Sequence, residues 1–119
     1  MKLPGPDHPI TITPSGERIT VRFNGRAVAE STKALELKEA SYPAVYYIPR
    51  ADVTPGVLVR TAHSTHCPYK GDASYFSLVA DGKTVENAVW SYETPFPAMA
   101  EIKDYVAFYG SKVDGIDAV

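Results

Sequence analysis

Thiol, imidazole, ammonium and phenol groups gather in one short segment of the chain, Thr65–Tyr75. A cysteine thiolate is nucleophilic when a neighbouring cation lowers its pKa, and a histidine transfers protons near neutral pH. Cys67 as a nucleophile and His66 as a general acid or base are therefore the candidate catalytic residues. The alternative is structural, because a free cysteine is among the most often buried residue types and a lone histidine usually serves packing.

Metal binding is the second chemistry to weigh, since His63, His66 and Cys67 lie within one stretch of five residues. Zinc sites need three or four ligands, usually paired at turn spacings. On a strand, His63 and Cys67 share one face and His66 points to the other. The remaining histidine, His8, is expected to be a bystander. The sequence thus predicts neither a metal site nor a cofactor.

Composition narrows the class of protein. The chain has 119 residues, 45% of them hydrophobic, which suits one domain with one core spanning 1–119. A net charge of −2 gives no reason to expect nucleic acid or an anionic membrane as partner. A single cysteine excludes an intrachain disulfide, and the first ten residues are proline-rich rather than apolar, so a cytoplasmic location is expected. Homo-oligomerisation stays open.

The elements that must position these groups are strands, because apolar residues recur mostly with a period of two between prolines and glycines. Two pairs of turn residues, Asn24-Gly25 and Asp81-Gly82, predict hairpins. We expect an all-β, mainly antiparallel fold with at most one or two short helical turns. The expected elements are strands at 19–23, 26–31, 35–37, 45–48, 57–63, 73–80 and 83–92, a helical turn at 49–53, and an irregular arm at 1–9. Residues 99–109 match both a helical and a strand spacing, and the aromatic and β-branched content of 105–109 favours a strand there with a turn or short helix before it.

The second hairpin has a register that can be worked out from its turn. With Asp81-Gly82 at the centre, Tyr75 is expected opposite Ala88. Tyr75, Trp90 and Tyr92 then share one face of the hairpin. Rings beside small residues leave a concavity, so this face predicts the wall of a pocket. A second packed core layer is the alternative.

Two basic residues complete the candidate site. Arg50 and Asp52 could form a salt-bridged surface turn, or Arg50 could present its guanidinium to an anionic ligand. Unbroken alternation along the strand would pair Lys70 with Glu93 on the opposite face from the aromatic residues. Lys70 can therefore reach the pocket only if the strand bulges or ends at Gly71. Tyr47 is expected to add a further aromatic wall.

Four segments together resemble the family called domain of unknown function 427, which is bacterial and fungal: Tyr46–Val53, Cys67–Tyr75, Trp90–Glu93 and Tyr105–Tyr109. The resemblance implies a fold like the β-tent group, in which two antiparallel sheets lean together. Some zinc-binding members of that wider group use two pairs of cysteines. This chain has only Cys67 and departs from them.

The family also carries a nucleotidyltransferase-like label. Nucleotidyl transfer normally requires spaced carboxylates that hold two magnesium ions near a glycine-rich segment. Asp52 and Asp72 lie in different segments and would have to converge in the folded chain.

Three hypotheses of different classes follow. The first is a small-ligand-binding domain for an anionic metabolite, with Arg50 and Lys70 as the basic groups. Its aromatic walls are Tyr47, Tyr75, Trp90 and Tyr92. The second is an enzyme, a transferase or hydrolase, that acts through Cys67 or His66, and the third is an interaction or assembly module.

Overall fold

Antiparallel strands make up most of the computed structural model, which describes residues 1–119. The strands are β1 (Ile10–Pro14), β2 (Ile19–Phe23), β3 (Arg26–Ser31), β4 (Leu35–Glu39), β5 (Val45–Pro49), β6 (Leu58–Cys67), β7 (Gly71–Ala80), β8 (Lys83–Ser91), β9 (Tyr105–Phe108) and β10 (Gly115–Ala118). The all-β prediction is confirmed.

Three short 3-10 helices interrupt the strands, one more than the most that was expected. They are η1 (Arg50–Asp52), η2 (Pro97–Ile102) and η3 (Gly110–Lys112). The first two coincide with the predicted helical turn and with the predicted short helix before the β9 strand. The third was not expected, and it is closed by a single local hydrogen bond from the Lys112 amide to the Tyr109 carbonyl. No helix is long and apolar enough to cross a membrane.

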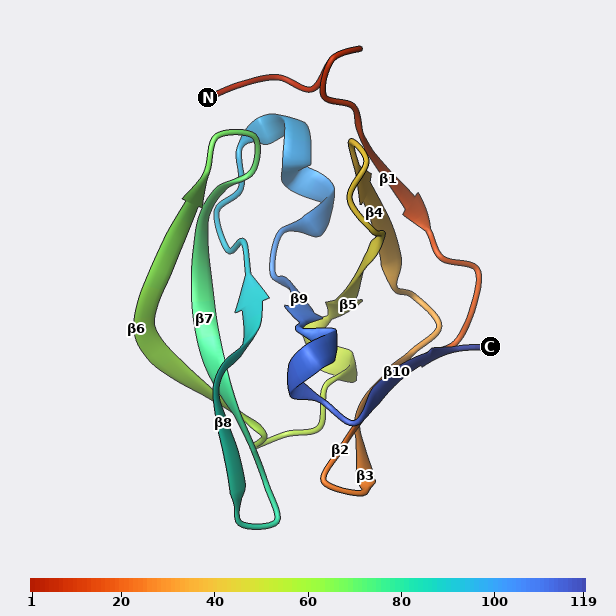
Figure 1. Ribbon diagram of the computed structural model, residues 1–119, viewed down its shortest axis with the longest axis vertical. Coiled ribbons are helices and arrows are strands. Elements are labelled where there is room, and N and C mark those ends of the chain that lie inside the picture. The colour runs from red at the N-terminus through yellow and green to blue at the C-terminus, as the bar shows by residue number, and fades with distance from the viewer.

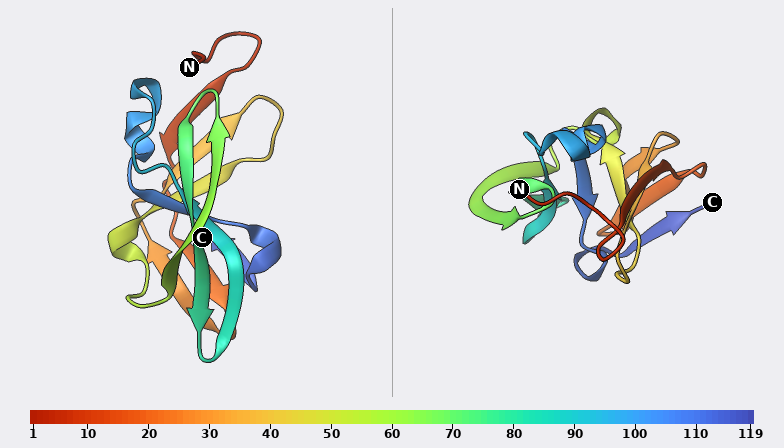
Figure 2. Two further views of the ribbon diagram at one scale, coloured as in Figure 1. Left: turned by 90° about the vertical axis from the view of Figure 1, so that its left-hand side faces the viewer. Right: turned by 90° about the horizontal axis from the view of Figure 1, so that it is seen from above.

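The strands form two sheets, one with the order β1-β4-β5-β9-β8-β7-β6 and one with the order β10-β2-β3. The large sheet is strongly bent, so that β6, β7 and β8 form one wall and β1, β4 and β5 form the opposite wall (Figure 1). Between them β9 is short and pairs with β5 over only two residue pairs. The helix η2 lies along one side of the space between the walls, at the back of the view in Figure 1 (Figure 2).

Both predicted hairpins are present, and their turns have the expected backbone. Asn24 and Gly25 have φ angles of 53° and 80°, and Asp81 and Gly82 have 52° and 82°. Two successive left-handed residues define the type I′ turn, whose twist matches that of the flanking strands. Local turn chemistry therefore fixes β2 against β3 and β7 against β8.

The predicted register of the second hairpin holds near the turn but is wrong beyond Leu78. There β8 advances four residues while β7 advances two, around a bulge that includes Asn87 with a φ of 52°. Tyr75 is consequently opposite Trp90 rather than Ala88. Because the shift is an even number of residues, the side chains keep their faces, and the predicted aromatic face survives.

Apolar side chains form two core clusters. The larger packs the three-stranded sheet against the lower parts of β7, β8 and β9, with Ile19, Phe23 and Leu78 at its centre. The smaller lies between the two walls, where Met99 and Ile102 of η2 pack against aromatic residues of both walls. This second cluster surrounds the candidate site.

Residues 1–9 form an arm without regular strands, apart from an isolated bridge between Gly5 and His8. The arm crosses the top of the molecule from one wall to the other (Figure 2). The Lys2 amide donates to the Pro68 carbonyl at 2.7 Å, and the His8 ring stacks on Tyr69 at a centroid distance of 4.2 Å. The arm is thus tied to the turn between β6 and β7.

Candidate functional site

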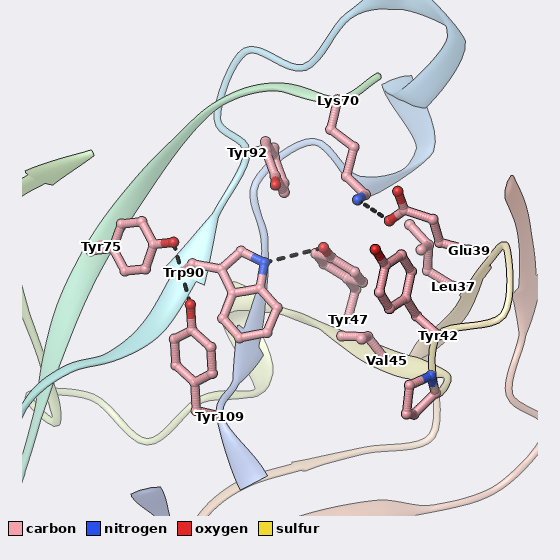
Figure 3. A pocket seen from close by; sticks show the side chains of 11 residues that line it. Leu37, Glu39, Tyr42, Val45, Tyr47, Lys70, Tyr75, Trp90, Tyr92 and Tyr109 are labelled. Carbon is pink, nitrogen blue, oxygen red and sulfur yellow. Dashed lines mark hydrogen bonds and ion pairs between the residues drawn. The ribbon is translucent and has the colours of Figure 1, made fainter. Parts of the chain in front are cut away.

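A cavity of about 330 Å³ lies between the two walls of the large sheet (Figure 3). Five tyrosines and the only tryptophan contribute most of its surface, and the polar groups gather at one end. The lining residues are Leu37, Glu39, Tyr42, Pro43, Val45, Tyr47, Lys70, Tyr75, Trp90, Tyr92 and Tyr109. The structure therefore brings together five of the six predicted ligand-binding residues: Tyr47, Lys70, Tyr75, Trp90 and Tyr92.

Contacts between the aromatic side chains fix the orientation of their rings. The Trp90 indole Nε1 donates to the Tyr47 hydroxyl at 3.1 Å, and the two rings meet edge to face. The Trp90 ring also lies against Tyr109 at a centroid distance of 4.5 Å. The Tyr75 and Tyr109 hydroxyls are 3.4 Å apart, and burial and this neighbour raise the pKa of Tyr109 to about 12. The wall is preorganised, and the Tyr109 phenol remains protonated at neutral pH.

Lys70 reaches the cavity because β7 begins at Gly71, the position at which the sequence predicts that the strand bulges or ends. Gly71 has a φ of 108°, which breaks the alternation that would have paired Lys70 with Glu93. A Cβ on Gly71 would also contact the backbone of Pro95 and Phe96. The Lys70 side chain is 9% exposed, and its Nζ lies 2.5 Å from a Glu39 carboxylate oxygen.

Glu39 and His8 were not predicted to belong to the site. His8 Nε2 lies 2.7 Å from the second oxygen of Glu39, so His8 is not a bystander. Burial of Glu39 acts to raise the pKa of its carboxyl group, but hydrogen bonds from Lys70 and His8 outweigh burial and hold that pKa below its ordinary value. A sequence signal did exist: alternation along β4 puts Glu39 on the same face as the buried Leu37.

Two hydroxyl groups in the cavity have unused hydrogen-bonding capacity. Tyr92 is 7% exposed, and its hydroxyl forms no hydrogen bond with the protein. The Tyr47 hydroxyl accepts from Trp90 but has no acceptor for its own proton. Burial raises the pKa of both phenols, so both are proton donors. Figure 3 shows the two hydroxyls and the Lys70 ammonium facing the same part of the cavity.

Arg50 does not reach this cavity, which corrects its assignment as a ligand-binding residue. Its guanidinium donates to Glu93 at 3.2 Å and lies 4.5 Å above the Phe76 ring. Arg60 binds the same carboxylate at 2.6 Å and 2.9 Å. The alternative interpretation, a surface turn with a salt bridge between Arg50 and Asp52, is not what forms either, because Arg50 pairs with Glu93 and Asp52 accepts from Ser31.

The two candidate catalytic residues do not form a pair. Cys67 is half-buried, and its Sγ lies 3.8 Å from the Lys70 Nζ. His66 is exposed and pairs instead with Asp72 at 2.7 Å. No hydrogen bond joins His66 to Cys67, so the arrangement lacks the contact by which a base activates a nucleophile.

The carboxylates considered for nucleotidyl transfer are also engaged separately. Asp52 accepts from Ser31 at 2.6 Å, while Asp72 contacts His66. No group of three or more histidine, cysteine, aspartate and glutamate side chains is arranged to hold a metal ion. The conditions for a two-metal reaction are therefore not met by these residues.

A second hollow, of about 580 Å³, adjoins the first. We call it the apolar groove. Its lining residues are Tyr42, Pro43, Ala44, Val45, Tyr46, Trp90, Phe108, Tyr109, Gly110 and Ile116. Five of these also line the cavity, so the two hollows share part of their lining, including Trp90 and Tyr109.

Fold and site together define an all-β domain with an internal aromatic cavity. The family model described as Domain of unknown function (DUF427) matches residues 11–118, and the chain belongs to this family, as the resemblance implied. A search of curated proteins finds no match.

Proposed function

We propose that this protein is a small-ligand-binding domain whose ligand occupies the aromatic cavity between the two walls. One observation carries the proposal: aromatic side chains from both walls surround a hollow, with the polar groups confined to one end. Concave, mainly apolar sites with a few convergent polar groups are typical of small-molecule recognition.

The architecture supports the proposal because it keeps the hollow open. Rings that touch edge to face or through hydroxyls cannot slide together to fill the space without breaking these contacts. The smaller core cluster holds the walls apart from behind, with Met99 and Ile102 buried against them. If the aromatic residues served only as a second core layer, the two walls would be expected to pack against each other without a hollow, since protein interiors pack densely.

The sequence suggested an anionic ligand, and the structure modifies that hypothesis. Lys70 is the only cation lining the cavity, and Glu39 already neutralises it. An anionic group would have to displace Glu39 or share Lys70 with it. The proposed site residues are therefore Tyr47, Lys70, Tyr75, Trp90 and Tyr92, with Glu39 and Tyr109 added. We place the domain in the cytoplasm, where the half-buried Cys67 thiol stays reduced.

A fragment screen read by nuclear magnetic resonance tests the function. Small aromatic and aliphatic compounds should shift the Trp90 indole resonance together with the backbone amides of Tyr47 and Tyr92. The matched variants are Val45→Phe, which fills the cavity, and Val59→Phe on the exposed face of β6.

Val45→Phe should abolish these shifts and Val59→Phe should preserve them. If a folded protein gives no cavity shifts with any compound, or if Val45→Phe leaves them intact, the proposed function is wrong.

A further inference from the structure

The polar end of the cavity carries a balanced charge, and this limits what can bind there. Lys70 and Glu39 are both largely buried and pair with each other. A ligand carboxylate would add an uncompensated negative charge beside Glu39 in a site poor in water, which is unfavourable. A ligand cation would be repelled by the Lys70 ammonium. This ammonium lies 5.9 Å from the Tyr92 ring centroid. Both kinds of charge are disfavoured at this end.

What the polar end offers instead is hydrogen-bond donation. The Tyr92 hydroxyl has no partner, and the Tyr47 hydroxyl has no acceptor for its proton. Neither hydroxyl has a protein acceptor for its proton, so a ligand oxygen placed between them would accept two hydrogen bonds that the protein itself does not supply. An uncharged oxygen acceptor satisfies both donors without disturbing the Lys70–Glu39 pair.

The cavity adjoins the apolar groove. Tyr42, Trp90 and Tyr109 line both hollows, while Phe108 and Ile116 extend the apolar surface beyond them. A ligand confined to the cavity would leave this surface exposed. A longer apolar body would cover it and gain in proportion to the area removed from water.

We infer that the ligand is an uncharged amphiphile, with an oxygen-bearing head at Tyr47 and Tyr92 and an apolar body that passes Trp90 into the apolar groove. The inference rests on the proposed function and adds to it the chemical class of the ligand. Primary amides, alcohols and esters with an aliphatic tail belong to this class.

Four probes separate the parts of the inference: octanamide, octanoate, octylammonium and butanamide. Dissociation constants would be measured by calorimetry and by Trp90 fluorescence. We expect octanamide to bind at least about tenfold more tightly than either charged probe of the same length. Each methylene buried in the groove is worth about fourfold, so butanamide, with four methylenes fewer, should bind up to about 250-fold more weakly than octanamide.

Two variants with matched controls locate the head and the tail. Tyr92→Phe keeps the ring but removes the unpartnered hydroxyl and should weaken octanamide about fivefold, while Tyr69→Phe, outside the cavity, should not. Ala44→Phe fills the groove from an exposed position and should weaken octanamide but not butanamide.

The outcomes distinguish this inference from the function on which it rests. Tighter binding of octanoate or octylammonium would overturn the uncharged head, and equal binding of butanamide and octanamide would overturn the extended body. Fragments that shift the cavity resonances while none of the four probes binds would overturn the inference and leave the proposed function standing. Failure of both fragments and probes would remove the function itself.

Discussion

Lys70 and Glu39, 31 residues apart in the sequence, form the ion pair that closes the polar end of the cavity. Each comes from a different wall: Lys70 precedes β7, and Glu39 ends β4. The pair therefore links the two walls across the space that the cavity occupies. Its partners extend outward to Cys67 behind Lys70 and to His8 on the N-terminal arm.

Removing one member of this pair should destabilise the fold. Glu39→Gln leaves the Lys70 ammonium buried without a counter-charge, and we expect a loss of about 2–4 kcal/mol in the free energy of unfolding. Urea denaturation measures it. Glu36→Gln, on the same strand but with no ion pair, is the control and should cost under about 0.5 kcal/mol.

The double variant Glu39→Gln/Lys70→Met should recover part of the loss, because no unpaired charge remains. Equal losses in Glu39→Gln and Glu36→Gln would contradict the role of the pair.

Acid should weaken the fold partly through Glu93. Hydrogen bonds from Arg60 lower the pKa of Glu93 to about 2 from its ordinary 4.5. Burial opposes this shift, while hydrogen bonds from Ser74 and Arg50 add to it. A carboxyl group with a depressed pKa in the folded state stabilises the fold above its unfolded pKa, and this contribution is lost as pH falls. Between pH 4.5 and about 2, the free energy of unfolding should therefore decrease.

The check is urea denaturation at a series of pH values in this range. Glu93→Gln should flatten the dependence, whereas Glu101→Gln, on an exposed part of η2, should leave it unchanged. An identical slope in wild type and Glu93→Gln would show that other carboxyl groups account for the acid sensitivity.

The bulge at Asn87 should favour glycine over alanine. Asn87 has a φ of 52° and accepts a hydrogen bond from Thr61 at 2.6 Å. Asn87→Gly and Asn87→Ala both lose this hydrogen bond, so their difference isolates the backbone. The left-handed conformation costs a residue with a Cβ about 1 kcal/mol, and Asn87→Gly should be the more stable by that amount. Thermal or urea unfolding of the two variants decides it, and a more stable alanine variant would mean that the bulge is not retained.

The N-terminal arm should depend on His8 through two separable contacts. His8→Ala removes both the stacking on Tyr69 and the contact with Glu39, and it should expose the arm to proteases. His8→Phe keeps a ring over Tyr69 and should protect the arm to an intermediate degree. Hydrogen exchange of the Lys2 amide, which donates to Pro68, provides a second reading. Wild-type protection in His8→Ala would show that the arm is held by backbone contacts alone.

Much of the fold follows from short-range patterns in the sequence. Asn24-Gly25 and Asp81-Gly82 tolerate the two left-handed angles that their turns need, so each hairpin is specified by adjacent residues. Alternation then assigns Tyr75, Trp90 and Tyr92 to one face, and Gly71 permits the break that turns Lys70 inward. These features depend on the geometry of one strand or one turn, and they can therefore be predicted from neighbouring residue types.

Other features were decided only by tertiary packing. The bulge at Asn87 places Trp90 opposite Tyr75, and no turn motif in the sequence predicts this bulge. Arg50 is drawn to Glu93 and Phe76, whereas Lys70 finds Glu39 on the opposite wall. The contacts of Arg50 and Lys70 join residues at least 26 positions apart, across elements whose approach depends on how the large sheet bends around β9. A charged side chain that becomes buried needs a partner of opposite charge. Which partner lies close enough depends on the packing of the two walls against each other.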